Sequence, residues 1–98
     1  MIGNPEDMMV EAVKRATRRA NPALEKLLEV HLKLNANAGF ELAYRDPKRF
    51  KEFVNKLFGE YSGRLLEMLI VDEIKRLLEI SEDLENLEKA VEILRMVV

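Results

Sequence analysis

The sequence predicts an all-α fold: a compact bundle of four to five helices in a single domain. Apolar residues recur three and four positions apart in successive segments, as they do along the buried face of a helix. Each of the three prolines directly follows an Asn or Asp, a pair typical of a helix start. No segment alternates apolar and polar residues as a strand does, and 98 residues are enough for one small core.

The first helix is expected over residues 5–20. Asn4 can cap it, Pro5 suits its first position, and acidic residues follow in the first turn, where they interact well with the helix dipole. Its apolar stripe consists of Met9, Val13, Ala16 and Ala20. The pair Asn21-Pro22 ends this helix and begins the next, because proline cannot continue a helix but can open one.

A second helix is expected over residues 22–34. Its apolar face carries Leu24, Leu27, Leu28, His31 and Leu34. The Asn and Gly residues of the segment 35–39 predict its end, since both tolerate the left-handed conformation that follows many helices. A short helix or turn is expected over residues 40–44.

The third substantial helix is expected over residues 47–58, opened by Asp46-Pro47 and closed by Gly59. Its stripe has the spacing of a core-facing helix and consists of Phe50, Phe53, Val54, Leu57 and Phe58. The fourth is expected over residues 62–80. Seven of the ten residues 65–74 are apolar, so this helix is predicted to be buried on several sides, as the central helix.

The last helix is expected over residues 82–97, with Ser81 as its N-cap. Its apolar residues follow at the alternating spacing of a coiled-coil seam: Leu84, Leu87, Val91, Leu94 and Val98. Five of the six residues 93–98 are apolar, on more than one side of the helix. Because a monomer could bury only one side, we expect self-association through the last two helices, most simply as a two-fold homodimer. The residues assigned to this contact are Leu87, Val91, Leu94, Val97 and Val98.

The composition excludes several classes of protein. There is no Cys, hence no disulfide, thiolate metal site or Cys nucleophile. The absence of Cys and Gln, together with 35% charged residues, favours a thermophilic source. The N-terminal residues lack the features of a signal peptide, and no apolar run could span a bilayer, so we expect a soluble, cytoplasmic protein without membrane contact.

Charge is divided unevenly along the chain. The net charge of −2 argues against a dedicated nucleic-acid binder. Residues 1–59 hold 11 Lys and Arg against 8 Asp and Glu, whereas residues 60–98 hold 5 against 10. A basic half and an acidic half suggest head-to-tail contact, or a partner that prefers one face.

A basic cluster lies in the first helix and consists of Lys14, Arg15, Arg18 and Arg19. It could bind phosphates or an acidic partner. It could equally be a solvated helix end, where cations favour the dipole, or pair with the acidic half of this chain. Solvation or self-pairing is favoured because the net charge is negative.

All six aromatic residues lie in one window of 22 residues, from Phe40 to Tyr61. The window could be a packing centre or a base-stacking platform, since Arg and Lys residues are interspersed. The helical spacing of its phenylalanines favours packing and places the basic residues on the opposite face. We therefore expect a hub where the helix 47–58 docks onto the apolar helix that follows.

No catalytic constellation is found. His31 is the only histidine, and without Cys or a second His it predicts a partly buried structural residue rather than a metal ligand or general base. The two serines, Ser62 and Ser81, occupy positions typical of caps, so no Ser-His-Asp arrangement can be assembled. We expect no enzyme activity, no metal and no cofactor.

One stretch of the chain carries a family resemblance. It consists of residues 46–50 (DPKRF), Val54, residues 57–60 (LFGE) and the apolar helix from Leu65. It resembles small archaeal helical domains of unknown function, the Nitrosopumilus-type output domains. The resemblance covers about residues 24–80 and implies a compact all-α module to which no catalytic residues are assigned.

Two functions are therefore expected from the sequence. The first is a non-enzymatic helical interaction or regulatory module, homodimeric through its C-terminal helices, with a possible protein partner. The alternative is a nucleic-acid-associated protein that uses the basic face of the first helix, together with that of the helix 47–58.

Overall fold

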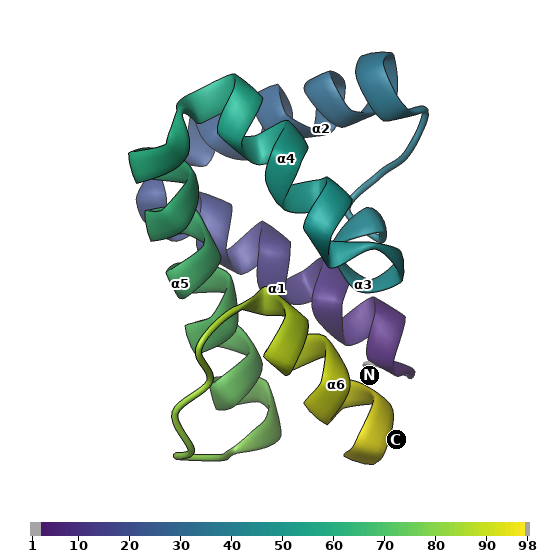
Figure 1. Cartoon of the computed structure of the whole chain (residues 1–98), viewed down its shortest axis with the longest axis vertical. Helices are drawn as coiled ribbons and strands as arrows, with labels where there is room; N and C mark the ends of the chain where they lie inside the picture. The colour runs from purple at the N-terminus through teal and green to yellow at the C-terminus, as the bar shows by residue number, and fades with distance from the viewer. Residues whose placement is uncertain (1–2, 98) are drawn as a thin grey trace.

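The computed structural model describes residues 3–97, which form six helices and no strand (Figure 1). The helices are α1 (Pro5–Ala20), α2 (Pro22–Ala36), α3 (Leu42–Arg45), α4 (Pro47–Phe58), α5 (Glu60–Leu78) and α6 (Leu87–Val97). The predicted all-α class is confirmed. No helix in this part of the chain combines the length and apolarity needed to cross a membrane.

The predicted caps explain three of the helix starts. The side chain of Asn4 accepts a hydrogen bond from the Asp7 N–H at 2.8 Å, and that of Asp46 accepts one from the Arg49 N–H at 3.2 Å. In each case a proline occupies the first helical position, where its missing N–H costs nothing. The bounds predicted for α1 and α4 are therefore confirmed.

Asn21 joins α1 directly to α2. Its backbone N–H donates to the Thr17 carbonyl at 2.9 Å and completes the last turn of α1. Its side chain accepts from the Ala23 N–H at 2.9 Å, and its carbonyl accepts from the Leu24 N–H, which starts α2. One residue thus ends one helix and begins the next, and no linker separates them.

Other boundaries differ from the prediction. Helix α2 continues to Ala36, because the left-handed residue that ends it is Asn37. Helix α5 begins at Glu60 because Gly59, with a φ of 89°, turns the chain within a single residue. It ends at Leu78, where Glu79 adopts the left-handed conformation without being a glycine. The short helix lies at 42–45 rather than 40–44.

The predicted start of the last helix is wrong. Residues 80–86 are not helical, and α6 begins only at Leu87. Asn86 provides the cap, since its side chain accepts from the Lys89 N–H at 2.9 Å. Ser81 makes no capping hydrogen bond within residues 3–97, so a cap-like residue type did not suffice to start a helix there.

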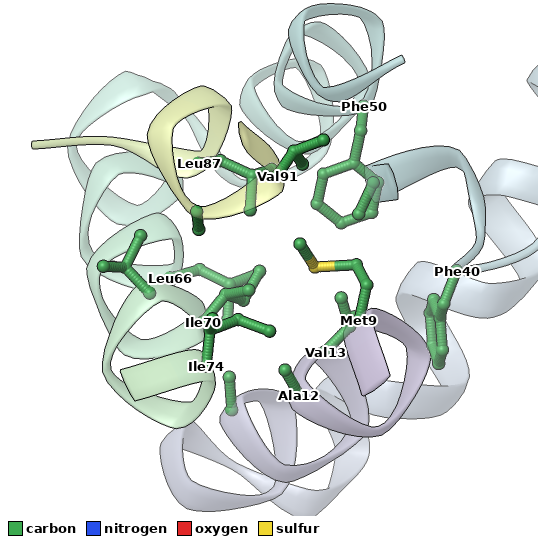
Figure 2. Close-up of a cluster of buried hydrophobic side chains, with 14 of the residues drawn as sticks. Met9, Ala12, Val13, Phe40, Phe50, Leu66, Ile70, Ile74, Leu87 and Val91 are labelled. Carbon is green, nitrogen blue, oxygen red and sulfur yellow. The ribbon is translucent and has the colours of Figure 1, made fainter. Parts of the chain in front are cut away.

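Helix α1, rather than α5, is the central helix. It packs against α2, α3, α5 and α6, and Figure 1 shows it crossing the middle of the molecule. Its buried face meets the buried face of α5 in the largest helix–helix contact of the fold. Figure 2 shows side chains from α1, α4, α5 and α6 converging on this core: Met9, Val13, Phe50, Ile70, Ile74, Leu87 and Val91.

The aromatic window is only partly a packing centre. Phe40 and Phe50 are buried in the core, and α4 packs along α5 as predicted. Phe53 and Phe58 are half-buried at its edge. Tyr61 is 79% exposed, so the prediction does not hold for this residue.

The prediction that α6 presents a self-association surface is wrong for three of its five residues. Leu87, Val91 and Leu94 are buried against α1, α4 and α5, so the seam of this helix is satisfied within the chain. Val97 is exposed, beside Met96. Val98 lies outside the described residues.

Candidate functional site

The basic cluster of α1 is largely neutralised by the chain itself. Arg15 pairs with Glu11 at 3.2 Å, and Arg18 donates two hydrogen bonds to Glu25 at 2.7 and 3.1 Å. The hydrogen bond from Arg18 lowers the pKa of the Glu25 carboxyl. Lys14, the fourth member, has no carboxylate within ion-pair distance among the described residues.

Arg19 connects the basic half of the chain to the acidic half. Its guanidinium lies 3.0 Å from Asp72 and 2.8 Å from Glu73, both on α5. Glu73 is buried, and its carboxylate has this partner 54 residues away. These two hydrogen bonds raise the pKa of Arg19. The predicted pairing with the chain's own acidic half is therefore confirmed for Arg19.

A second ion-pair network centres on Glu67, which is only 7% exposed. Its carboxylate accepts hydrogen bonds from Lys51 (3.0 Å), Arg64 (2.9 Å) and the backbone N–H of Leu87 (2.9 Å). Lys51 also bonds to Glu88 at 2.8 Å. Burial by itself would raise the pKa of Glu67, but these three donors outweigh it and lower that pKa. The network thereby fastens α4, α5 and α6 together.

These polar groups are arranged as structural ties. A general acid or base needs a polar atom free to reach a substrate, whereas both buried carboxylates are held by partners of this chain. His31 lies half-buried, as predicted, with its ring edge-on to Phe53 at 6.1 Å and its Nδ1 3.2 Å from the Asn35 amide. Within residues 3–97 no three His, Cys, Asp or Glu side chains gather as a metal site requires.

The outward face of α2 is an exposed apolar surface. Only Leu28 and Leu32 of this helix are fully buried. The opposite face carries a row of apolar residues at four- and three-residue spacing, which we call the outer seam: Ala23, Leu27, Val30 and Leu34. Leu27 is 49% exposed and Leu34 79% exposed. This spacing is that of a helix that packs against another helix, yet none of the described helices covers it.

An apolar groove continues this surface toward α5. It is a pocket of about 340 Å³ between the end of α1, the start of α2, the end of α4 and the start of α5. Its lining consists of Ala20, Leu24, Phe58, Ser62, Leu65, Leu66 and Leu69. Leu24 lies one turn from Leu27, and Leu65 lies one turn from the exposed Tyr61, so the groove connects the outer seam to apolar side chains of α5.

Cations border the outer seam. Lys26 and Lys33 lie seven residues apart on one side of it, both exposed. Across the other side, on α4, the Arg49 guanidinium lies 5.5 Å and the Lys56 ammonium 5.8 Å from the centre of the Phe53 ring. The prediction that the basic residues of this helix face away from its phenylalanines is therefore wrong at Phe53, because residues four before and three after it share its side of the helix.

Comparison with known families accounts for nearly the whole chain. Residues 3–96 match the family described as Nitrosopumilus output domain 5. The chain belongs to this family. The match confirms the resemblance and extends it over α1 and α6, beyond the residues 24–80 on which the resemblance rested.

A solved structure has the same fold as this output domain. The crystal structure of PH0832 from the archaeon Pyrococcus horikoshii OT3 covers 95% of each chain, at 44% sequence identity and a TM-score of 0.89. No curated protein matches the chain significantly. The family and the fold are thus established, and its function has to be argued from its surface.

The sequence-predicted sites and the observed surface differ in position. Most of the α1 cluster and of the α6 seam is engaged within the chain. Leu27 and Leu34 were predicted to lie on one face with Leu28, and this is wrong, because only Leu28 of the three is buried. A signal for the outer seam was present: apolar residues occur on more than one side of the helix 22–36, and only one side can face the core.

Proposed function

We propose that the chain is a non-enzymatic interaction module that binds a helix of a protein partner along the outer seam and the apolar groove. The observation that carries the proposal is the outer seam itself: three large aliphatic side chains at coiled-coil spacing, exposed on one helix. Contiguous exposed apolar surface on a folded domain is typical of a binding site. An amphipathic helix in a groove is a common way of filling such a site.

The arrangement of charge supports the same proposal. The buried carboxylates at Glu67 and Glu73 are tied to cations of the chain, so neither is free to act on a substrate. Covering one leucine side chain contributes up to about 1.5–3 kcal/mol. The family description, an output domain, suits a module that passes a signal to a partner.

Both functions expected from the sequence, in the form in which they were expected, have less support than binding along the outer seam. The apolar residues of α6 are engaged in the core, so the C-terminal helices offer only Met96 and Val97 as exposed aliphatic contacts. Nucleic-acid binding through α1 would need cations that are free, whereas Arg18 is held by Glu25 and Arg19 by Asp72 and the buried Glu73.

A peptide selection tests the proposal. A library of random amphipathic helices would be displayed against the immobilised full chain, and binders measured on the variants Leu34→Glu and Met96→Glu. These two residues are equally exposed, 79% each, so the second variant is a matched control. We expect selected helices to lose binding with Leu34→Glu and to keep it with Met96→Glu. Failure to select any helix, or selection of helices that only Met96→Glu weakens, contradicts the proposal.

A further inference from the structure

We infer that the partner helix is acidic: a helix of another protein whose apolar stripe is flanked by Asp or Glu and which lies along α2 between two rows of cations. This inference rests on the proposed function and adds the chemistry of the partner to it. It follows from where four cations of α2 and α4 lie relative to the outer seam.

The first row runs along α2. Lys26 and Lys33 are two turns apart and border the seam on the side away from α4. Lys33 has no carboxylate within ion-pair distance in the described part of the chain. Lys26 pairs with Glu29 at 3.3 Å, but both side chains are largely exposed, and such a pair contributes little. Both ammonium groups are therefore available to a partner.

The second row lies on α4. Its members, Arg49 and Lys56, have no ion-pair partner among residues 3–97, and Glu52, on the same side of the helix, pairs with neither. Both cations lie against the Phe53 ring, whose edge-on contact with His31 brings this side of α4 beside α2. His31 lies one turn from both Leu27 and Leu34, so the second row borders the seam on the side opposite Lys26 and Lys33.

The length of the seam sets the length of the partner helix. Ala23 and Leu34 are 11 positions apart, which corresponds to about 16 Å along the helix axis. A partner helix of at least about three turns could therefore cover the seam. Acidic residues on both sides of its stripe could reach one row of cations each, and such charge complementarity favours both the rate and the specificity of binding.

A second copy of this chain fits the surface less well. A two-fold arrangement that packs one outer seam against another antiparallel brings Lys26 of one copy near Lys33 of the other. The α4 cations would be brought together in the same contact. Like charges across an interface oppose association, so the cations that favour an acidic helix disfavour this pairing.

A nucleic acid also fits less well. Stacking of bases requires an open aromatic face, and three side chains of the chain already lie against Phe53. Tyr61, the most exposed aromatic residue, stands one turn before Leu65, and neither Arg nor Lys is part of the groove that Leu65 lines. The chain as a whole carries a net charge of −2, which opposes binding of a polyanion.

Two designed peptides test the inference on the full chain. Both would be helices of about 18 residues with the same leucine stripe, one flanked by Glu and the other by Lys. Fluorescence anisotropy at low and high salt would give their affinities. We expect the acidic peptide to bind at least about tenfold more tightly than the basic one, with a preference that weakens as salt is raised.

Two double variants test whether the preference for the acidic peptide arises from the cations beside the seam. Lys33→Glu combined with Lys56→Glu should weaken the acidic peptide about tenfold and strengthen the basic one. Lys14→Glu combined with Lys75→Glu makes the same change in net charge away from the seam and should leave both affinities unchanged. Thermal unfolding of each variant would verify that it is folded.

The outcomes separate the inference from the proposed function. Equal binding of both peptides, abolished by Leu34→Glu, would overturn the acidic partner and leave the interaction module standing. Binding of neither peptide, while selected helices still bind at the seam, would also overturn only the inference. A single-stranded oligonucleotide that binds more tightly than the acidic peptide, or concentration-dependent self-association that buries Leu34, would assign the surface to a different occupant.

Discussion

Helices α5 and α2 place their side chains in opposite ways. Helix α5 buries two glutamates, Glu67 and Glu73, beside the apolar core. Helix α2 exposes Leu27, Val30 and Leu34 to solvent. From polarity alone, the two glutamates would be expected at the surface and the three aliphatic residues in the core. The difference lies in the neighbours: each buried carboxylate on α5 meets cations of the chain, whereas no described element covers the outer seam.

The two helices thus use side chains against their usual preference for different purposes. On α5 charge serves the fold, since Glu67 joins three helices through hydrogen bonds that compensate its desolvation. On α2, apolar side chains lie at the surface of the fold and not in its core. If that surface serves a partner, changes on α5 should affect stability, and changes on the seam should affect binding.

The largest effect is expected at the core. Phe50→Ala should destabilise the fold by about 3–5 kcal/mol, because the side chain is only 1% exposed and its loss leaves a cavity. Chemical denaturation followed by circular dichroism measures the change. Phe53→Ala is the matched control and should cost less, since Phe53 is half-buried beside Arg49 and Lys56. An equal loss of unfolding free energy in the two variants would show that the edge of the core stabilises the fold as much as its centre does.

Removal of the buried carboxylate should rank next. Glu67→Ala should cost about 3 kcal/mol, because it leaves the buried Leu87 N–H without its acceptor and removes one of the two carboxylates that hold Lys51. The free energy of unfolding from urea titration checks this. Glu92→Ala, which breaks an exposed pair with Lys89, should change it by less than about 0.5 kcal/mol. A loss at Glu67 as small as that at Glu92 would contradict the role given to the network.

Acid should weaken the same tie. The pKa of Glu67 is lower in the folded chain than in the unfolded one, so its contribution is complete above the unfolded pKa of about 4.3 and is lost as pH falls through the folded value. Glu67→Gln should therefore be less stable than the parent at neutral pH, with a difference that shrinks below about pH 4. Thermal unfolding across this range measures it. A difference independent of pH would assign the loss to packing.

The smallest effect on stability is expected at the outer seam. Leu34→Ser and Leu27→Ser should each change the free energy of unfolding by less than about 0.5 kcal/mol, because much of each side chain is already in water. Leu28→Ser, one position further along the same helix and fully buried, is the control and should be strongly destabilising. A marked loss at Leu34 would mean that the seam supports the fold itself.

Local signals allowed much of the fold to be predicted. Asn4 and Asp46 cap α1 and α4 as expected, because a cap involves only neighbouring backbone groups. The start of α6 was mispredicted because Ser81 and Asn86 are both cap-forming residue types, and the choice between them depends on how the segment packs. The left-handed Glu79 gave no signal, since this residue type rarely adopts that conformation.

The candidate site was harder to predict because it depends on contacts between distant residues. Whether Arg19 is free or paired is decided by Glu73, 54 positions away. The seam of α6 and the outer seam of α2 have the same spacing in the sequence. Only the docking of α6 on α1 and α5 distinguishes them, and that docking requires the complete fold.

The single-residue joint at Asn21 has a consequence for how this surface can evolve. Because Asn21 completes α1 and begins α2 with no slack, the rotation of α2 about its own axis is fixed by the residue count at the joint. One inserted residue would turn the following helix by about 100° and carry the leucines of the outer seam out of line with the α4 cations. An insertion or deletion at this corner would therefore separate the two parts of the surface, whereas a substitution that keeps the cap would leave them aligned.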